Sequence, residues 1–254
     1  MYFFFVSSII FQVYTLLFPD WERIAVMLIT LLNHWEDMSF TTFVIMLFSY
    51  AAVILVMLPV HELAHAFAAD RLGDHTAKWN GRLTLNPLKH LDVFGTVMLC
   101  LCGFGYAKPV PVNPYNFRHP KRDMALTALA GPMSNLLMAA LSLALYRVIY
   151  TFAHSAFILN VAAQVLINTF ASINIGLAVF NLLPIPPLDG SRIFGFFLPD
   201  RWVYTMERYS QYITLALLLL LLTGVLTVPL NFLSRLIGNF LCLILGLHGI
   251  VRFF

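Results

Sequence analysis

Six long apolar segments run through this 254-residue chain and restrict it to a small set of folds. They fall at about residues 2–18, 40–69, 124–151, 157–183, 211–230 and 236–251. A helix needs about 20 residues to cross the hydrocarbon core of a bilayer, and only helices and closed barrels satisfy their backbone hydrogen bonds there. Only 11% of the residues are charged, against roughly 25% in soluble domains. We therefore predict an all-α polytopic membrane protein with about six transmembrane helices.

Two shorter apolar stretches lie between these segments. Residues 24–33 are too few to cross, and the tryptophan and acidic side chains on both sides favour a segment at the membrane interface. Residues 93–106 are also short and contain three glycines, which favours a re-entrant segment. A secretory signal peptide begins with basic residues, but no Lys or Arg precedes Arg23. We therefore expect the first apolar segment to be a retained span and not a cleaved signal peptide. The three cysteines lie in or beside apolar segments and are expected to be buried thiols.

The basic residues predict how the chain is oriented. Eight of them gather in residues 70–123, whereas the loop at about 152–156 has none. Because Lys and Arg mark cytoplasmic loops, residues 70–123 and the arginine-bearing stretch 184–210 are both predicted to be cytoplasmic. The net charge of +3 is too small and too dispersed to favour nucleic acid as a partner.

The apolar segment at 40–69 ends in a group of ionisable residues, His61-Glu62-Leu63-Ala64-His65. Histidines four residues apart lie on one face of a helix and can bind one ion, and the glutamate beside them can act as a general base. In this composition the pattern would arise by chance in roughly 0.4% of chains. Ionisable side chains within an apolar helix are costly and by default functional. We therefore favour a metal site over histidines that are satisfied by ordinary hydrogen bonds.

Two downstream carboxylates could complete such a site, since a catalytic zinc ion commonly has three protein ligands and one open position. Glu207 lies in a polar stretch. Asp189 belongs to the sequence NLLPIPPLDGSRI at 181–193, where three prolines end the preceding helix and Gly190 permits a tight turn. We favour Asp189 as the third ligand, although an ordinary Asp-Gly turn would give the same local pattern.

The two motifs together resemble the site-2 protease family of intramembrane zinc metallopeptidases, which pairs an HExxH helix with a distal PLDG motif. HELAH at 61–65 and PPLDG at 186–190 stand in the same order here. The resemblance covers about residues 55–195 and includes GRLTLNPLKHLD at 81–92 and GPMSN at 131–135. Ser191, where a second glycine is frequent, and Val93, where many relatives have proline, depart from the family pattern.

The resemblance implies a role for each motif residue. His61, His65 and Asp189 would bind one zinc ion, Glu62 would be the catalytic base, and Asn135 would assist at the reaction centre. An amide at Asn135 could instead join two helices by a hydrogen bond.

The resemblance also implies an architecture. Its catalytic core has three helices, here those beginning near residues 40, 124 and 157, with a short re-entrant or β-hairpin segment. We expect a single membrane-embedded peptidase domain over 1–254, with the core at about 40–195, an N-terminal span and interfacial segment at 1–39, and C-terminal helices at 211–254. The PDZ and CBS domains of some relatives have no counterpart in the sequence, which indicates the compact form.

The expected activity is hydrolysis of peptide bonds in or near transmembrane segments of membrane proteins, known as regulated intramembrane proteolysis. The expected partners are a membrane-protein substrate and the lipid bilayer, and the active site would lie toward the cytoplasmic side. A substrate helix must be unwound before it can be cut. Residues 82–86 alternate at period two and could offer a strand edge to the unwound segment, or they could simply cover the zinc.

Five amide side chains share one face of the segment at 157–183, and they could admit water or join helices. They are Asn160, Gln164, Asn168, Asn174 and Asn181.

Two other functions fit parts of the pattern. A transporter could bind an ion at broken helices near the membrane midplane, but the chain shows no inverted repeat. A catalytically inactive relative could bind membrane-protein clients, but it would have little need of Glu62. The sequence predicts no oligomeric state.

Overall fold

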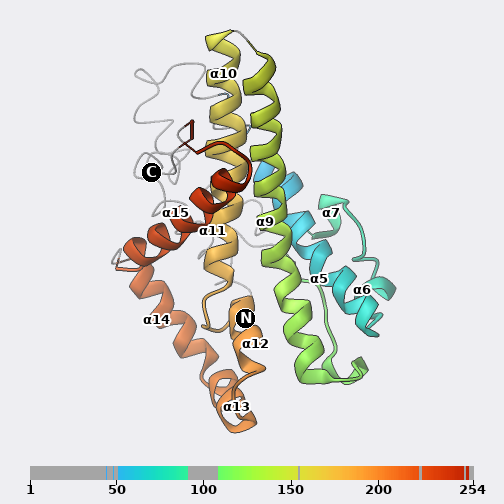
Figure 1. The fold of residues 1–254 in the computed structure, drawn as a ribbon. Helices are drawn as coiled ribbons and strands as arrows, with labels where there is room; N and C mark the ends of the chain where they lie inside the picture. Colours follow the sequence, from blue (N-terminus) through green and yellow to red (C-terminus); the bar gives the residue numbers. More distant parts are fainter. Residues whose placement is uncertain are drawn as a thin grey trace.

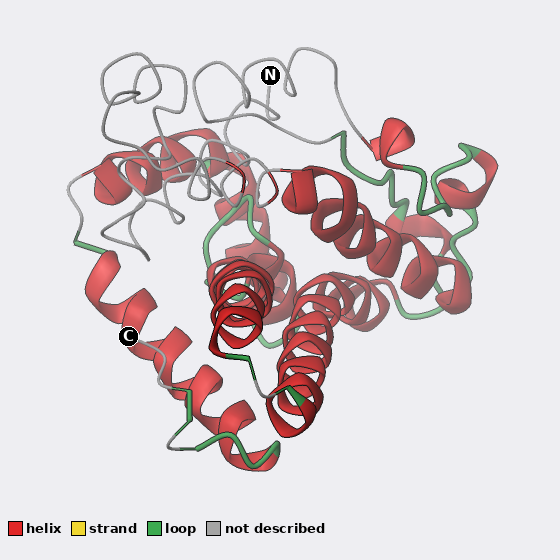
Figure 2. Cartoon of the chain, turned by 90° about the horizontal axis from the view of Figure 1, so that it is seen from above, coloured by secondary structure: helices red, strands yellow, loops and turns green. Residues whose placement is uncertain are grey.

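The computed structural model describes residues 44, 48, 51–90, 108–153, 155–222, 225–248, 250 and 251. This part of the chain is mostly helical and contains no β-sheet, in agreement with the predicted all-α class (Figure 1). The elements are, in chain order, η2 (Val53–Met57), α5 (Leu58–Leu72), α6 (Thr76–Trp79), α7 (Pro87–His90), η3 (Pro114–Asn116), α9 (Pro120–Phe152), α10 (Ala156–Ala162), η4 (Ala163–Ala171), α11 (Ser172–Asn181), α12 (Asp189–Gly195), α13 (Asp200–Arg208), α14 (Ser210–Leu222) and α15 (Thr227–Ile244). Figure 2 shows the long central helices nearly end-on, lying side by side.

Helix α5 carries the HELAH motif and continues directly from the π-helical turn η2. Pro59 lies in its first turn, where proline is tolerated. The helix ends at Gly73, whose φ of 110° lies in the left-handed region that favours glycine. The N–H groups of Gly73 and Asp74 then bond back to the carbonyls of Asp70 and Ala69, at 3.3 and 2.9 Å. The motif is therefore part of a helix whose C-terminal end is fixed.

Helix α9 is the longest of the described helices and packs against α5, α11 and α12. It begins at Pro120, and the Asp123 carboxylate accepts a hydrogen bond from the His119 N–H at 2.9 Å, which stabilises the first turn. Pro132 lies inside the helix without ending it. Because α9 contacts both α5 and α12, it can hold the two sequence motifs against each other.

Helix α11 is the centre of the described fold, and all ten of its residues are buried. It completes the continuous helical run from Ala156 to Asn181, and it packs between α9 and α15. Three prolines follow within the loop at 182–188, which explains why the helix cannot continue. The expected break in the helix is therefore confirmed, and a new helix, α12, begins at Asp189. Of the five amides predicted to share one face, Asn174 and Asn181 are buried and Asn160 is exposed.

The boundary between the last two apolar segments differs from the prediction. We predicted segments at 211–230 and 236–251, but α14 ends at Leu222 and α15 runs from Thr227 to Ile244. Pro229 lies in the first turn of α15, where proline is tolerated. Gly246, with a φ of 65°, follows the last turn and ends the helix. Residues 231–235, which separate the two predicted segments, are part of this helix.

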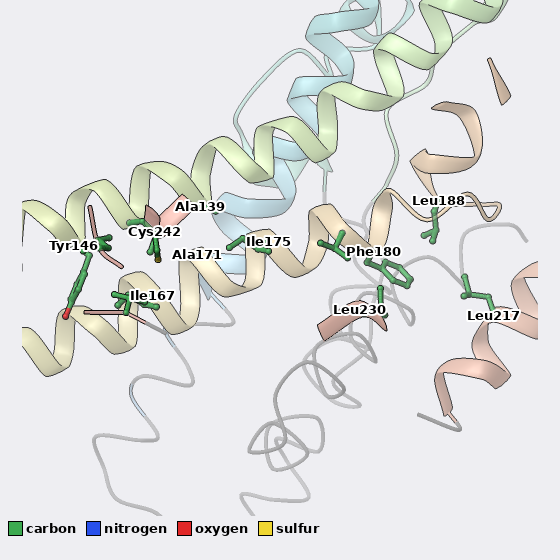
Figure 3. Close-up of a cluster of buried hydrophobic side chains, with 14 residues drawn as sticks. Ala139, Tyr146, Ile167, Ala171, Ile175, Phe180, Leu188, Leu217, Leu230 and Cys242 are labelled. Atoms are coloured by element: carbon green, nitrogen blue, oxygen red, sulfur yellow. The ribbon is translucent and has the colours of Figure 1, made fainter. Parts of the chain in front are cut away.

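A hydrophobic core fills the space between α9, η4, α11, α14 and α15 (Figure 3). Its buried residues are Ala139, Leu143, Tyr146, Ile167, Ala171, Ile175, Val179, Phe180, Leu188, Leu217, Leu230, Cys242, Leu247 and Val251. Cys242 is a free, buried thiol, as predicted. Because Phe180 and Leu188 flank the proline-rich loop, their burial fixes the position at which α12 starts.

The outward faces of the long helices are apolar. On α9 the exposed apolar side chains recur every three or four residues: Met133, Leu137, Leu141, Leu145, Val148 and Phe152. A similar row follows α15: Val228, Phe232, Leu236, Phe240 and Leu243. A helix that is apolar on its outer as well as its inner face is typical of a membrane span. Three described helices are long and apolar enough to cross a membrane, Pro120–Phe152, Ala156–Asn181 and Thr227–Ile244, as expected of a membrane protein.

Other architectural predictions are not confirmed. The count of six spans depends partly on residues 2–18, which lie outside the described residues. The predicted interfacial segment 24–33 and the predicted re-entrant segment 93–106 also lie outside them. Residues 82–86 are irregular, with a bend at 83–84, and form no strand. Local side-chain bonds explain this, because the His90 imidazole bonds the Thr84 carbonyl at 2.8 Å and the Thr84 hydroxyl accepts from the Asn86 N–H at 3.1 Å.

Candidate metal centre

The two histidines of the HELAH motif face each other on α5. His61 and His65 are both about 8% exposed, and their Nε2 atoms are 3.1 Å apart. Their four-residue spacing places one ring a single helical turn above the other, which is why the rings meet. The geometry matches the expectation from the sequence that both imidazoles lie on one face.

Asp189 reaches the same point from α12. Its Oδ2 atom lies 3.4 Å from His61 Nε2 and 3.3 Å from His65 Nε2. Gly190 makes this approach possible, because a Cβ at that position would lie 2.2 Å from the Leu183 carbonyl oxygen. The first turn of α12 can therefore pack directly against the end of α11, which directs the carboxylate toward α5.

The three atoms form a nearly equilateral triangle that fits a zinc ion. Zinc–ligand bonds of about 2.0–2.1 Å at tetrahedral angles place the ligand atoms about 3.3–3.4 Å apart. The observed separations of 3.1, 3.3 and 3.4 Å agree with this value. Asp189 Oδ2 contacts both imidazole nitrogens and has no other hydrogen-bond partner among the described residues. A cation is the ligand that this set of donors suits.

Helix α9 fixes the orientation of one ring. His65 Nδ1 lies 2.8 Å from the backbone carbonyl oxygen of Thr127. A carbonyl only accepts, so Nδ1 carries the proton, and in the neutral ring the lone pair is then on Nε2, facing Asp189. A hydrogen bond of this kind orients a metal-binding histidine and increases its basicity. Thr127 was not among the site residues expected from the sequence, because a backbone carbonyl leaves no signature in a motif.

Glu62, next to His61, is held by a segment distant in the sequence. Residues 108–113, which we call the strap, have no helical structure and run beside α5. The N–H of Val110 donates a hydrogen bond to Glu62 Oε2 at 3.1 Å. The carboxylate is therefore fixed beside the histidines, with its second oxygen left for another partner. Val110 is a second functional contact that the sequence did not reveal.

The first end of the strap is bound to the end of α7 and to Arg82, which lies between α6 and α7. The Lys108 N–H donates to the His90 carbonyl at 2.7 Å. The buried Arg82 guanidinium donates to the carbonyl of Lys89 and lies 3.5 Å from that of Lys108. Arg82 and His90 thus hold the strap where it approaches Glu62.

Asp74 ties the other end. Its fully buried carboxylate accepts hydrogen bonds from the Asn113 N–H and the Asn116 amide, both at 2.7 Å, and from the Thr76 N–H at 3.1 Å. Burial alone would raise the pKa of the Asp74 carboxyl, but hydrogen bonds from Thr76, Asn116 and Asn113 more than offset this and hold the pKa below its ordinary value. Asp74 is therefore a charged anchor between the end of α5 and the strap.

Known proteins with related sequences share a metalloprotease name. Residues 148–222 match the family described as Peptidase family M50. The chain is 39% identical to "Putative zinc metalloprotease YwhC" of Bacillus subtilis over 173 residues, which cover 67% of this chain and 78% of that relative. The chain belongs to peptidase family M50.

More distant relatives of this M50 peptidase carry a similar name. It is 36% identical to "Putative zinc metalloprotease Rip2" of Mycolicibacterium smegmatis over 141 residues and 37% identical to Rip2 of Mycobacterium tuberculosis over 142 residues. The chain spans about half the length of these Rip2 relatives, since each match covers 52% of the relative. No solved structure matches the chain.

Family membership confirms the resemblance drawn from the two motifs. The M50 peptidase is a zinc metalloprotease, so the expected cofactor is also confirmed, and the interpretation as a transporter is set aside. The structure brings together His61, His65 and Asp189, and it places Glu62 beside them. Asn135 lies on α9, fully buried, and its amide nitrogen and oxygen have no hydrogen-bond partner among the described residues.

Proposed function

We propose that this M50 peptidase is an intramembrane endopeptidase that hydrolyses peptide bonds in or near transmembrane segments of membrane proteins. The observation that carries the proposal is the triangle of His61 Nε2, His65 Nε2 and Asp189 Oδ2, packed against the apolar part of α9. Such a site can cleave a membrane segment only where that segment can reach it, so its depth along α9 matters.

The charges on α9 support a position of the site within the membrane. Lys121, Arg122 and Asp123 mark one end of the helix, and residues 124–146 contain no charged side chain. Thr127, which bonds His65, lies four residues after Asp123, or about 6 Å along a helix that rises 1.5 Å per residue. This short distance from a charged helix end supports a site that is nearer one face of the bilayer than its middle. The basic residues of that end support the cytoplasmic face.

His61, His65 and Asp189 are the residues that would hold the zinc ion in this proposal. When bound, zinc lowers the pKa of a coordinated water to about 7 and polarises a carbonyl group. Glu62 would accept the proton of the attacking water through the carboxylate oxygen that Val110 leaves free, and would deliver it to the leaving amine. The Val110 N–H keeps the carboxylate oriented while the proton moves.

Asn135 would assist by donating a hydrogen bond to the developing oxyanion. Its amide is buried and has no hydrogen-bond partner within the described part of the chain, which is costly unless a partner arrives during the reaction. It lies one helical turn beyond Gly131, on the face of α9 that meets the two histidines.

We further propose the topology predicted from the sequence: one membrane-embedded domain with six crossings, a re-entrant segment, and the site toward the cytoplasm. The partners would be the bilayer and a membrane-spanning substrate. The substrate helix would unwind locally before cleavage, since its scissile carbonyl is otherwise hydrogen-bonded within the helix.

A substitution of Glu62 tests the activity. The full chain is reconstituted in vesicles with a model membrane-spanning substrate, and Glu62→Gln is compared with the wild type for zinc content and cleavage. We expect zinc to be retained and cleavage to fall at least a hundredfold, roughly the contribution of a general base. Glu207→Gln, at an exposed position of α13, is the matched control and should cleave normally. Cleavage by Glu62→Gln at the wild-type rate would refute the assignment, and no cleavage by the wild type of any membrane substrate would favour an inactive relative.

A further inference from the structure

Helix α9 approaches the candidate metal centre at a residue with no side chain. A Cβ built at Gly131 would lie 2.3 Å from His65 Nε2, 2.5 Å from His65 Cε1 and 2.6 Å from His61 Cε1. Contacts this short do not occur between real side chains, so any other residue at 131 would require one of the partners to move. The three nearest atoms all belong to the histidine rings, at or next to the nitrogens that face Asp189.

Glycine destabilises the middle of a helix, so its presence there often means that no larger side chain would fit. Alanine is more favourable than glycine inside a helix, because glycine loses more backbone freedom on folding. Gly195, in α12, shows the contrast: a Cβ there would lie 3.7 Å from the nearest atom, Val203 Cγ2, which is an ordinary contact. Gly131 is therefore explained by close approach to the histidines, and not by the needs of α9 itself.

The histidine rings have little freedom to give way. His65 is bound through Nδ1 to the carbonyl of Thr127, which lies on α9 one turn before Gly131. Residues 127–131 of α9 thus bind the His65 ring at Nδ1, through the Thr127 carbonyl, and leave space for its Nε2 side at Gly131. A methyl group at 131 would push the ring away from α9 while the Thr127 carbonyl holds it there.

We infer that Gly131 is a positioning residue for the metal centre: the missing side chain lets α9 set the ring planes of His61 and His65 so that both Nε2 atoms point at one ion. This inference rests on the proposed role of the two histidines as ligands. The predicted consequence is that a single methyl group at 131 weakens metal binding although no ligand residue is replaced.

Metal affinity gives the first test, on the full chain in detergent or vesicles by competition with a zinc chelator. Gly131→Ala should weaken zinc binding roughly tenfold or more, comparable with the loss of a group that orients a ligand. Gly195→Ala is the control, and its zinc affinity should remain within about twofold of the wild type. Wild-type affinity in Gly131→Ala would overturn the inference.

A double-mutant cycle in the presence of chelator tests the contact without metal. Gly131→Ala is introduced into the wild type and into a chain that carries His61→Ala and His65→Ala, and thermal unfolding of each is followed. We expect the methyl group to lower the midpoint in the wild type and to leave it equal or higher where the rings are absent, because groups in contact are not additive. An equal loss in both backgrounds would overturn the inference.

The two tests separate the inference from the proposed function. A wild type that binds no zinc would refute the proposed site, while the metal-free cycle would still decide whether Gly131 makes room for the rings. If Gly131→Ala fails to fold, folding of the triple variant supports the contact, and failure of the triple variant as well contradicts it.

Discussion

Replacing Asp189 by asparagine separates the metal role of this residue from its structural role. The change keeps the shape of the side chain but removes the charge at the third corner of the triangle, 3.3 and 3.4 Å from the two histidine nitrogens. In the metal-free chain Asp189 Oδ2 contacts both imidazoles, and the amide of asparagine can still form a hydrogen bond with a neutral imidazole. We therefore expect Asp189→Asn to fold, and its chelator-treated stability to change much less than its zinc affinity.

Zinc binding should respond much more strongly than the fold. Four-ligand zinc sites bind with about 10–16 kcal/mol, so one ligand contributes on the order of 3 kcal/mol. Since about 1.4 kcal/mol corresponds to a factor of ten, Asp189→Asn should bind zinc at least a hundredfold more weakly. Chelator competition on the purified chain measures this directly, with thermal unfolding as the check on the fold.

Asp200→Asn is a suitable control, because that carboxylate is exposed and pairs with Lys121 at 2.9 Å on the surface. It should leave zinc affinity unchanged. Zinc affinity in Asp189→Asn within about threefold of the wild type would refute the view that the carboxylate is a ligand.

Two further predictions concern the strap and the substrate. Asp74→Asn should lower the unfolding midpoint at pH 7, because it removes a charged acceptor of several hydrogen bonds, each worth about 1.5–3 kcal/mol. Because folding lowers the pKa of Asp74, its contribution is present above the unfolded value of about 3.9 and is lost as the pH falls through the folded value, so the difference from the wild type should shrink in acid. A constant difference between pH 7 and pH 3 would contradict this. For the substrate, Gly or Pro near the scissile bond should raise kcat/KM over a leucine-rich variant, because less helix must be unwound, and equal rates would count against unwinding as a requirement.

The sequence was sufficient for the features that depend on local chemistry. The apolar segments predicted a helical membrane protein, because a lipid-exposed backbone must satisfy its own hydrogen bonds. The spacing of His61 and His65 predicted that their rings share one helix face, since that follows from the helical repeat alone. The prolines before Asp189 predicted a break in the helix. The sequence pattern misled us at residues 82–86. Their alternation suggested a strand, but side chains in this segment form hydrogen bonds with nearby backbone groups instead of leaving these groups for strand pairing.

What only the tertiary structure decided is the convergence of distant parts of the chain. Asp189 lies more than a hundred residues from the histidines, and its approach depends on the packing of α12 against α9 and on the close contact of Gly190 with Leu182 and Leu183. The Thr127 carbonyl and the Val110 N–H also act on the site, yet backbone groups leave no signature in a motif. Gly131 belongs to the GPMSN motif, but only the structure shows which rings occupy the space beside it. A sequence states which side chains are present, whereas the packing of α9 determines which backbone atoms meet them and how closely.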